Sequence, residues 1–218
     1  IPLALELAAA RVKALSVDQI SARLDDRFRL LTGGARTALP RQQTLRALID
    51  WSYNLLSDKE KTLFRRLAVF VGGWDLEAVE TVCVGENIES YEVLDLLTNL
   101  VEKSLVITEE VPDGIRYRRL ETIRHYAREK FLETDEVSII RQRHADWFLR
   151  LAIKRDPKLD ETRLERRFAQ LEVEHDNLRA AFEWLLHAEP KHALELASAS
   201  GHFYLAQGLF SEGREVLR

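Results

Sequence analysis

A change of hydrophobic period near the middle of the chain limits its fold class more than any other feature. Residues 105–108 and 115–118 alternate between apolar and polar side chains, and they flank Val111-Pro112-Asp113-Gly114. Proline fixes the φ angle at the start of a turn and glycine accepts a positive φ angle at its end, so this pattern predicts a β-hairpin. Elsewhere the apolar residues recur at helical spacing. We therefore expect a mainly α fold with one hairpin.

Helix-start signals place several short helices before the hairpin. Ser57-Asp58-Lys59-Glu60 is a capping box, Asp75 can cap a short helix that runs through Cys83, and a further helix is predicted from about residue 91 to residue 103. The side chains of this last helix that we expect to face the core are Val93, Leu94, Leu97, Leu100 and Val101. Short helices followed by a hairpin are the element order of a winged-helix domain, in which the hairpin is the wing.

Breaks in the periodicity divide the chain into four predicted parts. Residues 1–34 form helices, one of which starts at Ser16 with Gln19 reaching back, and residues 35–43 form an extended linker around Pro40. Residues 44–135 form the winged-helix domain. Residues 136–218 read as helices with interruptions near 156–157 and 189–190.

The last part admits two interpretations. Gly201 and Tyr204 have the spacing of a tetratricopeptide unit, which predicts helical hairpins that stack as repeats. Small residues also allow close packing in any helical hairpin, so an ordinary α-helical bundle is the alternative.

Cysteine content and charge exclude several classes of protein. The single cysteine, Cys83, cannot form an internal disulfide, and no apolar run is long enough to span a membrane, so we expect a cytoplasmic protein. The net charge is −4 and the isoelectric point is about 5.9, without the basic stripe that marks a nucleic-acid binder. The chain has no methionine, and its apolar opening residues read as the inside of a longer protein, so we expect a fragment.

Catalytic patterns are missing from the sequence. The six histidines do not occur at metal-ligand spacings, and the sequence contains no phosphate-binding loop and no nucleophile motif. We expect His144 and His175 to make capping or surface polar contacts, and Cys83 to belong to the core. The sequence therefore predicts neither an enzyme nor a metal site.

Several dispersed segments resemble one family. Residues 1–5, Ile-Pro-Leu-Ala-Leu, are similar to the G-L-P-L-A motif near the end of the nucleotide-binding module of STAND-class (NB-ARC-like) signalling ATPases. Residues 45–53, 70–74 and 117–124 resemble the winged-helix region of bacterial STAND transcriptional regulators, many of which carry LuxR-type or SARP-type DNA-binding domains. Residues 171–181 resemble the sequence that precedes their tetratricopeptide sensor. The segments follow one another in the order that this family would have.

The resemblance implies roles for particular residues. Pro2 and Leu3 would lie on the adenine side of a nucleotide, although Pro2 could instead simply start a helix. ATP or ADP would bind to the full-length parent, and none is expected to bind this fragment. Arg119, Leu120 and Glu121 match a Met-His-Asp motif whose histidine contacts the β-phosphate in eukaryotic relatives. Leucine cannot donate a hydrogen bond, so Arg119 and Glu121 remain only as candidate regulatory contacts.

The resemblance also implies a function. The winged helix would be a nucleotide-dependent lid between the ATPase module upstream in the same chain and a repeat sensor for a protein or small-molecule inducer, with 35–43 as the hinge. The full-length protein would oligomerise. The alternative is a DNA-binding winged-helix protein with a helical dimerisation tail.

Charge on the third helix decides against sequence-specific DNA binding by this fragment. We expect Glu92, Asp95, Asn99 and Glu102 to face solvent, and this face has no base. Arg116 and Arg118 of the wing are candidate nonspecific contacts to a DNA backbone.

Overall fold

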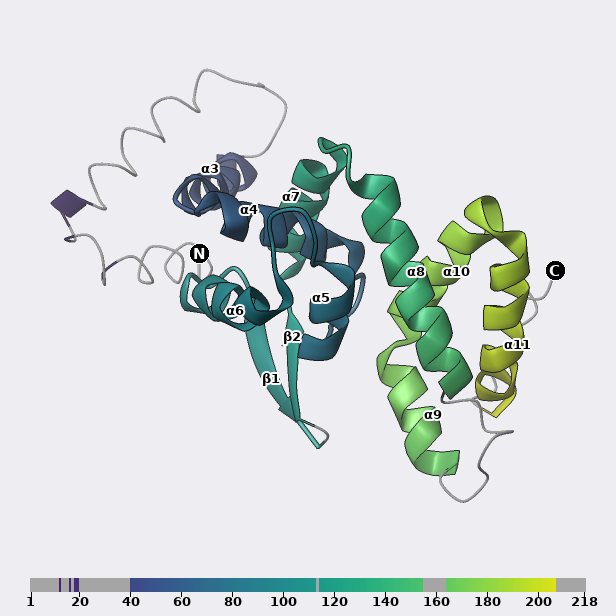
Figure 1. Cartoon of the computed structure of the whole chain (residues 1–218). Coiled ribbons are helices and arrows are strands. Elements are labelled where there is room, and N and C mark those ends of the chain that lie inside the picture. Colours follow the sequence, from purple (N-terminus) through teal and green to yellow (C-terminus); the bar gives the residue numbers. More distant parts are fainter. Residues whose placement is uncertain are drawn as a thin grey trace.

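The computed structural model describes residues 12, 16, 18–19, 40–112, 114–154 and 164–206. Over these ranges the chain is mainly helical, with one β-hairpin followed by C-terminal helices (Figure 1), which confirms the predicted fold class. The elements are α3 (Pro40–Asn54), α4 (Asp58–Arg66), η1 (Leu67–Val69), α5 (Leu76–Val82), η2 (Ser90–Glu92), α6 (Val93–Glu102), β1 (Ile107–Val111), β2 (Gly114–Arg118), α7 (Glu121–Leu132), α8 (Val137–Lys154), α9 (Leu164–Val173), α10 (His175–Ala188) and α11 (Pro190–Ala206).

The predicted helix caps are present. Ser57 accepts a hydrogen bond from the backbone of Glu60 at 3.3 Å, and Glu60 accepts one from the backbone of Ser57 at 2.7 Å. Asp75 accepts a bond from the Ala78 N–H at 2.8 Å and so starts α5. Ser16 and Gln19 form the same reciprocal pair, at 3.1 and 3.2 Å. Each cap is a local pattern of three or four residues, which is why the sequence reveals it.

The wing is a two-stranded antiparallel sheet. Val111 pairs with Gly114, and Ile107 pairs with Arg118 at the other end of the hairpin. Gly114 has a φ angle of 135°, a conformation that favours glycine. The first strand starts two residues later than expected, because Leu105 and Val106 are buried beneath the hairpin instead of pairing in it. Trp74 adds one further bridge, through two backbone hydrogen bonds to Tyr117 at 2.8 and 2.9 Å.

Two sequence predictions about helices are wrong in detail. Leu94 of α6 is 48% exposed and does not face the core, whereas Leu96 is buried, so the apolar stripe follows positions 93, 96, 97 and 100. Val101 is partly buried against the same core. Residues 40–43 belong to α3 and not to an extended linker, since proline is tolerated in the first turn of a helix. The remainder of the predicted linker lies outside the described residues.

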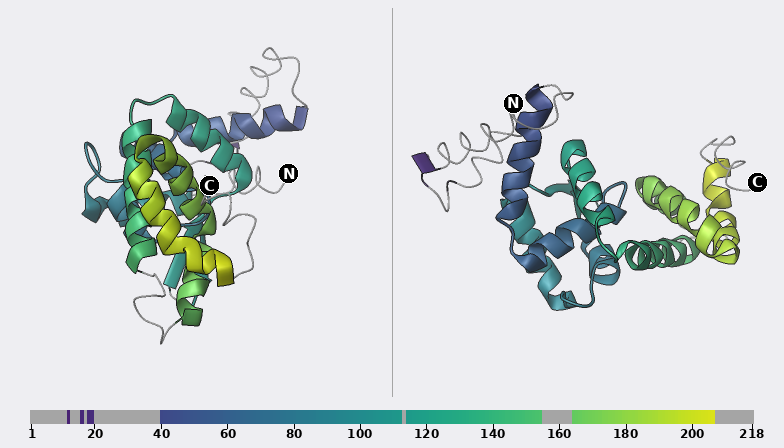
Figure 2. Two further views of the ribbon diagram at one scale, coloured as in Figure 1. Left: turned by 90° about the vertical axis from the view of Figure 1, so that its right-hand side faces the viewer. Right: turned by 90° about the horizontal axis from the view of Figure 1, so that it is seen from above.

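The C-terminal helices lie to one side of the winged helix, and α8 leads from one part to the other (Figures 1 and 2). Helix α8 packs against both α10 and α11. The predicted interruption at 189–190 is confirmed, because α10 ends at Ala188 and α11 begins at Pro190. The interruption near 156–157 lies outside the described residues. An additional break, at Glu174 between α9 and α10, was not predicted.

The core continues from the winged helix into the C-terminal helices. Phe70 stacks on Trp74 at 5.5 Å between ring centroids, and it also contacts His144 of α8 at 5.3 Å. His144 in turn lies 4.6 Å from Phe148. The two parts therefore share buried aromatic surface. Within the described ranges, no helix is long and apolar enough to cross a membrane.

Candidate functional site at the winged-helix joint

In winged-helix proteins that read DNA, the second helix of the helix-turn-helix enters the major groove, and here that helix is α6. Its exposed side chains are Leu94, Asp95, Thr98, Asn99 and Glu102. The predicted exposure of Asp95, Asn99 and Glu102 is confirmed, whereas Glu92 is only 22% exposed and pairs with Lys59. This face therefore presents two carboxylates and no cation.

The wing adds little positive charge to this face. Glu109 and Glu110 of β1 are exposed, and Arg118 pairs with Glu109 at 3.2 Å while remaining 51% exposed. Arg116 turns away from solvent and is only 14% exposed. Of the two arginines predicted to contact a DNA backbone, only Arg118 is accessible in this conformation.

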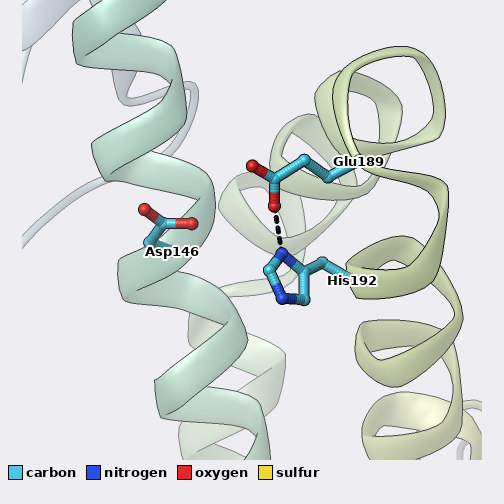
Figure 3. Close-up of side chains that lie close together, drawn as sticks. All are labelled: Asp146, Glu189 and His192. Atoms are coloured by element: carbon cyan, nitrogen blue, oxygen red, sulfur yellow. Dashed lines mark hydrogen bonds and ion pairs between the residues drawn. The ribbon is translucent and has the colours of Figure 1, made fainter.

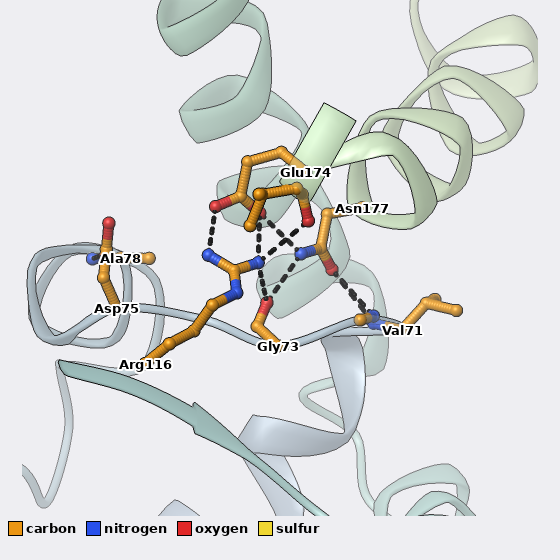
Figure 4. A network of polar contacts seen from close by, with 9 residues as sticks. Val71, Gly73, Asp75, Ala78, Arg116, Glu174 and Asn177 are labelled. Atoms are coloured by element: carbon orange, nitrogen blue, oxygen red, sulfur yellow. Dashed lines mark hydrogen bonds and ion pairs between the residues drawn. The ribbon is translucent and has the colours of Figure 1, made fainter. Parts of the chain in front are cut away.

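Asn177 of α10 holds the winged helix against the C-terminal helices (Figure 4). Its side chain is fully buried. The amide oxygen accepts hydrogen bonds from the Val71 and Gly72 N–H groups at 3.0 and 3.4 Å, and the amide nitrogen donates to the Gly73 carbonyl at 2.8 Å. It also donates to Glu174 at 2.9 Å. One side chain thus pairs with three consecutive backbone residues that lie more than a hundred positions away.

A buried ion pair completes the same contact. Arg116 donates to the two oxygens of Glu174 at 2.6 and 3.0 Å, and Glu174 is 7% exposed. The guanidinium also donates to the carbonyls of Gly73 at 2.9 Å and Val173 at 3.1 Å. A bidentate arginine–carboxylate pair fixes both orientation and distance. We call the set of residues 71–73, Arg116, Glu174 and Asn177 the joint, since it ties the wing and the 70–74 turn to the start of α10.

Gly73 is required at the joint because a side chain has no room there. A Cβ atom on Gly73 would lie 2.8 Å from Nε of Arg116 and 2.9 Å from the Tyr117 carbonyl oxygen, whereas one on Gly72 would have its nearest contacts at 3.6 Å. We expect Gly73→Ala to lower the free energy of unfolding by about 1–3 kcal/mol, the usual cost of overpacking. Gly72→Ala is the matched control and should change it by less than about 0.5 kcal/mol. Urea denaturation measures both, and equal losses would contradict this account.

His144 gives the structure a pH dependence. Burial lowers its pKa from 6.5 to about 3, so the folded state keeps the imidazole neutral while the unfolded chain takes up a proton below pH 6.5. Stability from this residue is present above pH 6.5 and is lost as the pH falls. Between pH 7 and pH 5 we expect a loss of about 2 kcal/mol from His144 alone. His144→Phe should remove that component, and an unchanged pH slope in urea denaturation would contradict it.

The structure places the predicted site residues in different surroundings. Pro2 and Leu3 lie outside the described residues. Arg119 is buried, with its guanidinium 5.2 Å from the Trp74 ring centroid and hydrogen-bonded to the Phe64 and Leu67 carbonyls. Burial lowers its pKa to about 9. An arginine in that position supports the core, so a regulatory contact to another module would require the domain to open.

Glu121 remains accessible, as its predicted role requires. Its side chain is 63% exposed and pairs with Arg124 at 2.7 Å and His125 at 3.1 Å on the surface of α7. Nothing buried holds it in place. Its regulatory role stays a prediction.

Sequence reasoning missed three buried polar residues. His144 was expected at a cap or on the surface, but it is buried, and no expectation singled out Asn177, which is buried and central to the joint. Arg66 is 2% exposed, and it bonds to Glu136 and to the Cys83 and Gly85 carbonyls. Its position on the apolar face between Leu63 and Phe70 is the signal that could have revealed it. Cys83 is in the core as predicted, and burial raises its pKa to about 12.

One group of side chains could hold a metal ion within the described part of the chain. Asp146, Glu189 and His192 place one donor atom each within 4.8 Å of one another (Figure 3). Two carboxylates and an imidazole are a ligand set that zinc uses. His192 already bonds to Glu189, and Gln142 donates to Asp146 at 3.0 Å. Each bond stays within one segment, the first at the start of α11 and the second within α8, and together they occupy donor atoms of all three side chains, so we assign no metal to the group.

Comparisons with known proteins agree with this geometry. A family model described as a winged helix-turn-helix domain matches residues 56–131. The chain is 47% identical over 214 residues to the "Putative HTH-type transcriptional regulator Rv0890c" of Mycobacterium tuberculosis (strain ATCC 25618 / H37Rv), covering 98% of this chain and 24% of that protein. The Mycobacterium bovis protein "Putative HTH-type transcriptional regulator Mb0914c" matches equally well.

A second M. tuberculosis protein, "Uncharacterized protein Rv0894", is 43% identical over 145 residues, covering 66% of this chain and 37% of that protein. No solved structure matches the chain. The chain spans about a quarter of the length of the two regulators that it resembles. Its helices α4 to α7 with their single wing, residues 56–131, are a winged helix-turn-helix domain that is followed by C-terminal helices.

Proposed function

We propose that this chain is the regulatory segment of a cytoplasmic STAND-type ATPase transcriptional regulator, and that its winged helix acts as a nucleotide-dependent lid instead of reading DNA. The similarity to two mycobacterial proteins named as HTH-type regulators supports a place in a transcriptional regulator. The nucleotide, ATP or ADP, would bind to a module upstream in the parent, and the chain itself would not hydrolyse it. The parent would oligomerise when the lid is released.

The acidic surface of the winged helix carries this proposal. Asp95 and Glu102 on α6 and Glu109 and Glu110 on the wing are exposed. Proteins bind DNA largely by replacing counterions on phosphates with Lys and Arg. Carboxylates in the position of the reading helix oppose that exchange, whereas they suit a contact with a basic protein surface.

The joint supplies the second requirement of a lid, which is mechanical coupling. The wing and the 70–74 turn are bonded to α10 through Arg116 and Asn177. A displacement of the C-terminal helices by an inducer would therefore move the winged helix as well. Rigid-body rotation of a domain about an interface is a common form of switching.

Direct DNA reading by this winged helix is the second candidate, and the names of the relatives favour it. A selection from a library of randomised DNA duplexes at about 150 mM salt distinguishes the lid role from sequence-specific DNA binding. We expect no enriched sequence, and a dissociation constant no tighter than about 10⁻⁶ M for any duplex, as is typical of nonspecific contacts. Arg118→Gln should weaken that residual binding further.

Enrichment of one sequence with nanomolar affinity, lost on Asn99→Ala, would overturn the lid proposal. Asn99 is exposed on α6, and its side chain makes no hydrogen bond to another residue in the part of the chain that the structure describes, so its replacement tests DNA contact without disturbing the core.

A further inference from the structure

A cavity of about 540 Å³ lies beside the joint, between the winged helix and the C-terminal helices. Its walls come from the segment 68–71, from α7, from α8 and from α10. A volume of this size falls within the range of small-molecule sites in proteins, which often occur between domains. Neither the proposed lid role nor the joint makes use of it.

The cavity carries positive charge that the described residues neutralise only in part, because Glu121 pairs with Arg124 alone. Arg124, Arg128 and Arg141 line it. Arg128 has no ionic or hydrogen-bond partner among the described residues, and Arg141 lies over the Trp184 ring at 5.6 Å without a carboxylate partner there. The one acidic residue of the lining, Glu183, pairs with Arg179, which is outside the cavity, at 3.3 Å.

Aromatic side chains form the inner wall, and Trp184 is the one among them that is only partly buried. Phe70, Phe131 and Trp184 line the cavity together with His144. His144 is 2% exposed, and its Nε2 atom has no hydrogen-bond partner. Phe70 and Phe131 are also almost completely buried, so Trp184 is the ring of this wall that a ligand could contact.

We propose that this cavity binds a small organic anion. Its flat apolar body would lie against Trp184, and its carboxylate, sulfonate or phosphate group would pair with Arg128 and Arg141. Guanidinium groups suit such anions because they offer two parallel donors to a pair of oxygens. The inference does not depend on the lid role, since it concerns binding to this chain alone.

Two fluorescent probes of the same shape test the requirement for charge. The first is 1-anilinonaphthalene-8-sulfonate, and the second is N-phenyl-1-naphthylamine, which has the same rings without the sulfonate. Both are titrated against the whole chain. We expect the sulfonate to bind at least about tenfold more tightly, the factor that roughly 1.4 kcal/mol represents. Equal affinity for the two probes would overturn the proposal.

Variants locate the binding. Arg128→Gln should weaken the sulfonate about tenfold and leave the neutral probe unchanged, whereas Arg150→Gln, an exposed arginine of α8 outside the lining, should affect neither. Ala180→Phe would place a ring in the cavity and should abolish binding of both probes, with the thermal midpoint showing that the variant is folded. Sulfonate binding that survives Arg128→Gln and Ala180→Phe would show that the probe binds elsewhere and would refute the site.

Competition then identifies the head group. Inorganic phosphate, indole-3-acetate and adenosine monophosphate are added to the chain with the sulfonate bound. Displacement by an aromatic carboxylate or phosphate, but not by inorganic phosphate at the same concentration, is expected. Displacement by inorganic phosphate alone would contradict a site that recognises the apolar body.

Discussion

Replacing Asn177 with alanine is expected to lower the free energy of unfolding by about 3 kcal/mol, because it removes four hydrogen bonds and leaves buried backbone groups unpaired. We expect the joint to lose stability before the rest of the chain does. We expect amides in the 70–74 turn and at the start of α10 to exchange faster with solvent, while amides within α4 and α6 remain protected. Hydrogen exchange and urea denaturation measure the two effects.

Asn99→Ala is the matched control, since it removes the same side chain from an exposed position on α6. Its free energy of unfolding should change by less than about 0.5 kcal/mol. A similar loss in the two variants, or exchange that accelerates uniformly over the chain, would show that Asn177 does not act through the joint.

Replacing Arg66 with methionine should have the other large effect. The guanidinium is almost completely buried and connects α4 to Glu136 and to the carbonyls of Cys83 and Gly85. Methionine leaves Glu136 and both carbonyls without this partner, and breaking a buried pair in this way costs about 3–5 kcal/mol. Arg118→Met, at an exposed position of the wing, should change stability by less than about 1 kcal/mol.

The pH dependence of this loss follows from Glu136. Its hydrogen bond with Arg66 lowers the pKa of the Glu136 carboxyl below the ordinary 4.5. The stability that the pair contributes is therefore present above pH 4.5 and is lost as the pH falls through the lowered pKa. The difference in the free energy of unfolding between wild type and Arg66→Met should be constant from pH 7 to pH 5 and should shrink in more acidic solution. A difference that grows on acidification would contradict the assignment.

Local signals predicted most of the fold. The capping boxes at Ser57 and Ser16, the cap at Asp75 and the turn before Gly114 are patterns within four residues, and each is present. The element order then indicates a winged helix. The prediction for Leu94 was wrong because a helix rotates by about 100° per residue, so an apolar stripe assigned one or two positions off places an exposed side chain in the core.

The candidate site could not be derived in the same way. The 70–74 turn and the segment around Asn177 both attracted notice as sequence patterns, but nothing in either segment shows that they bond to each other. The hydrogen bonds from Asn177 to residues 71–73 span more than a hundred residues, and Arg116 resembles any basic residue of a wing until Glu174 is found beside it. Only the packing of α8 and α10 brings these groups together.

The coupling of the winged helix to the C-terminal helices is tested most directly by a distance measurement between spin labels. Labels attached at Thr98→Cys on α6 and Glu195→Cys on α11 occupy exposed positions, and the buried Cys83, whose thiol has its pKa raised to about 12, should not react. We predict a single narrow distance distribution that broadens in Asn177→Ala. A broad or two-component distribution in the wild-type chain, unchanged by Asn177→Ala, would contradict a joint that holds the two parts together.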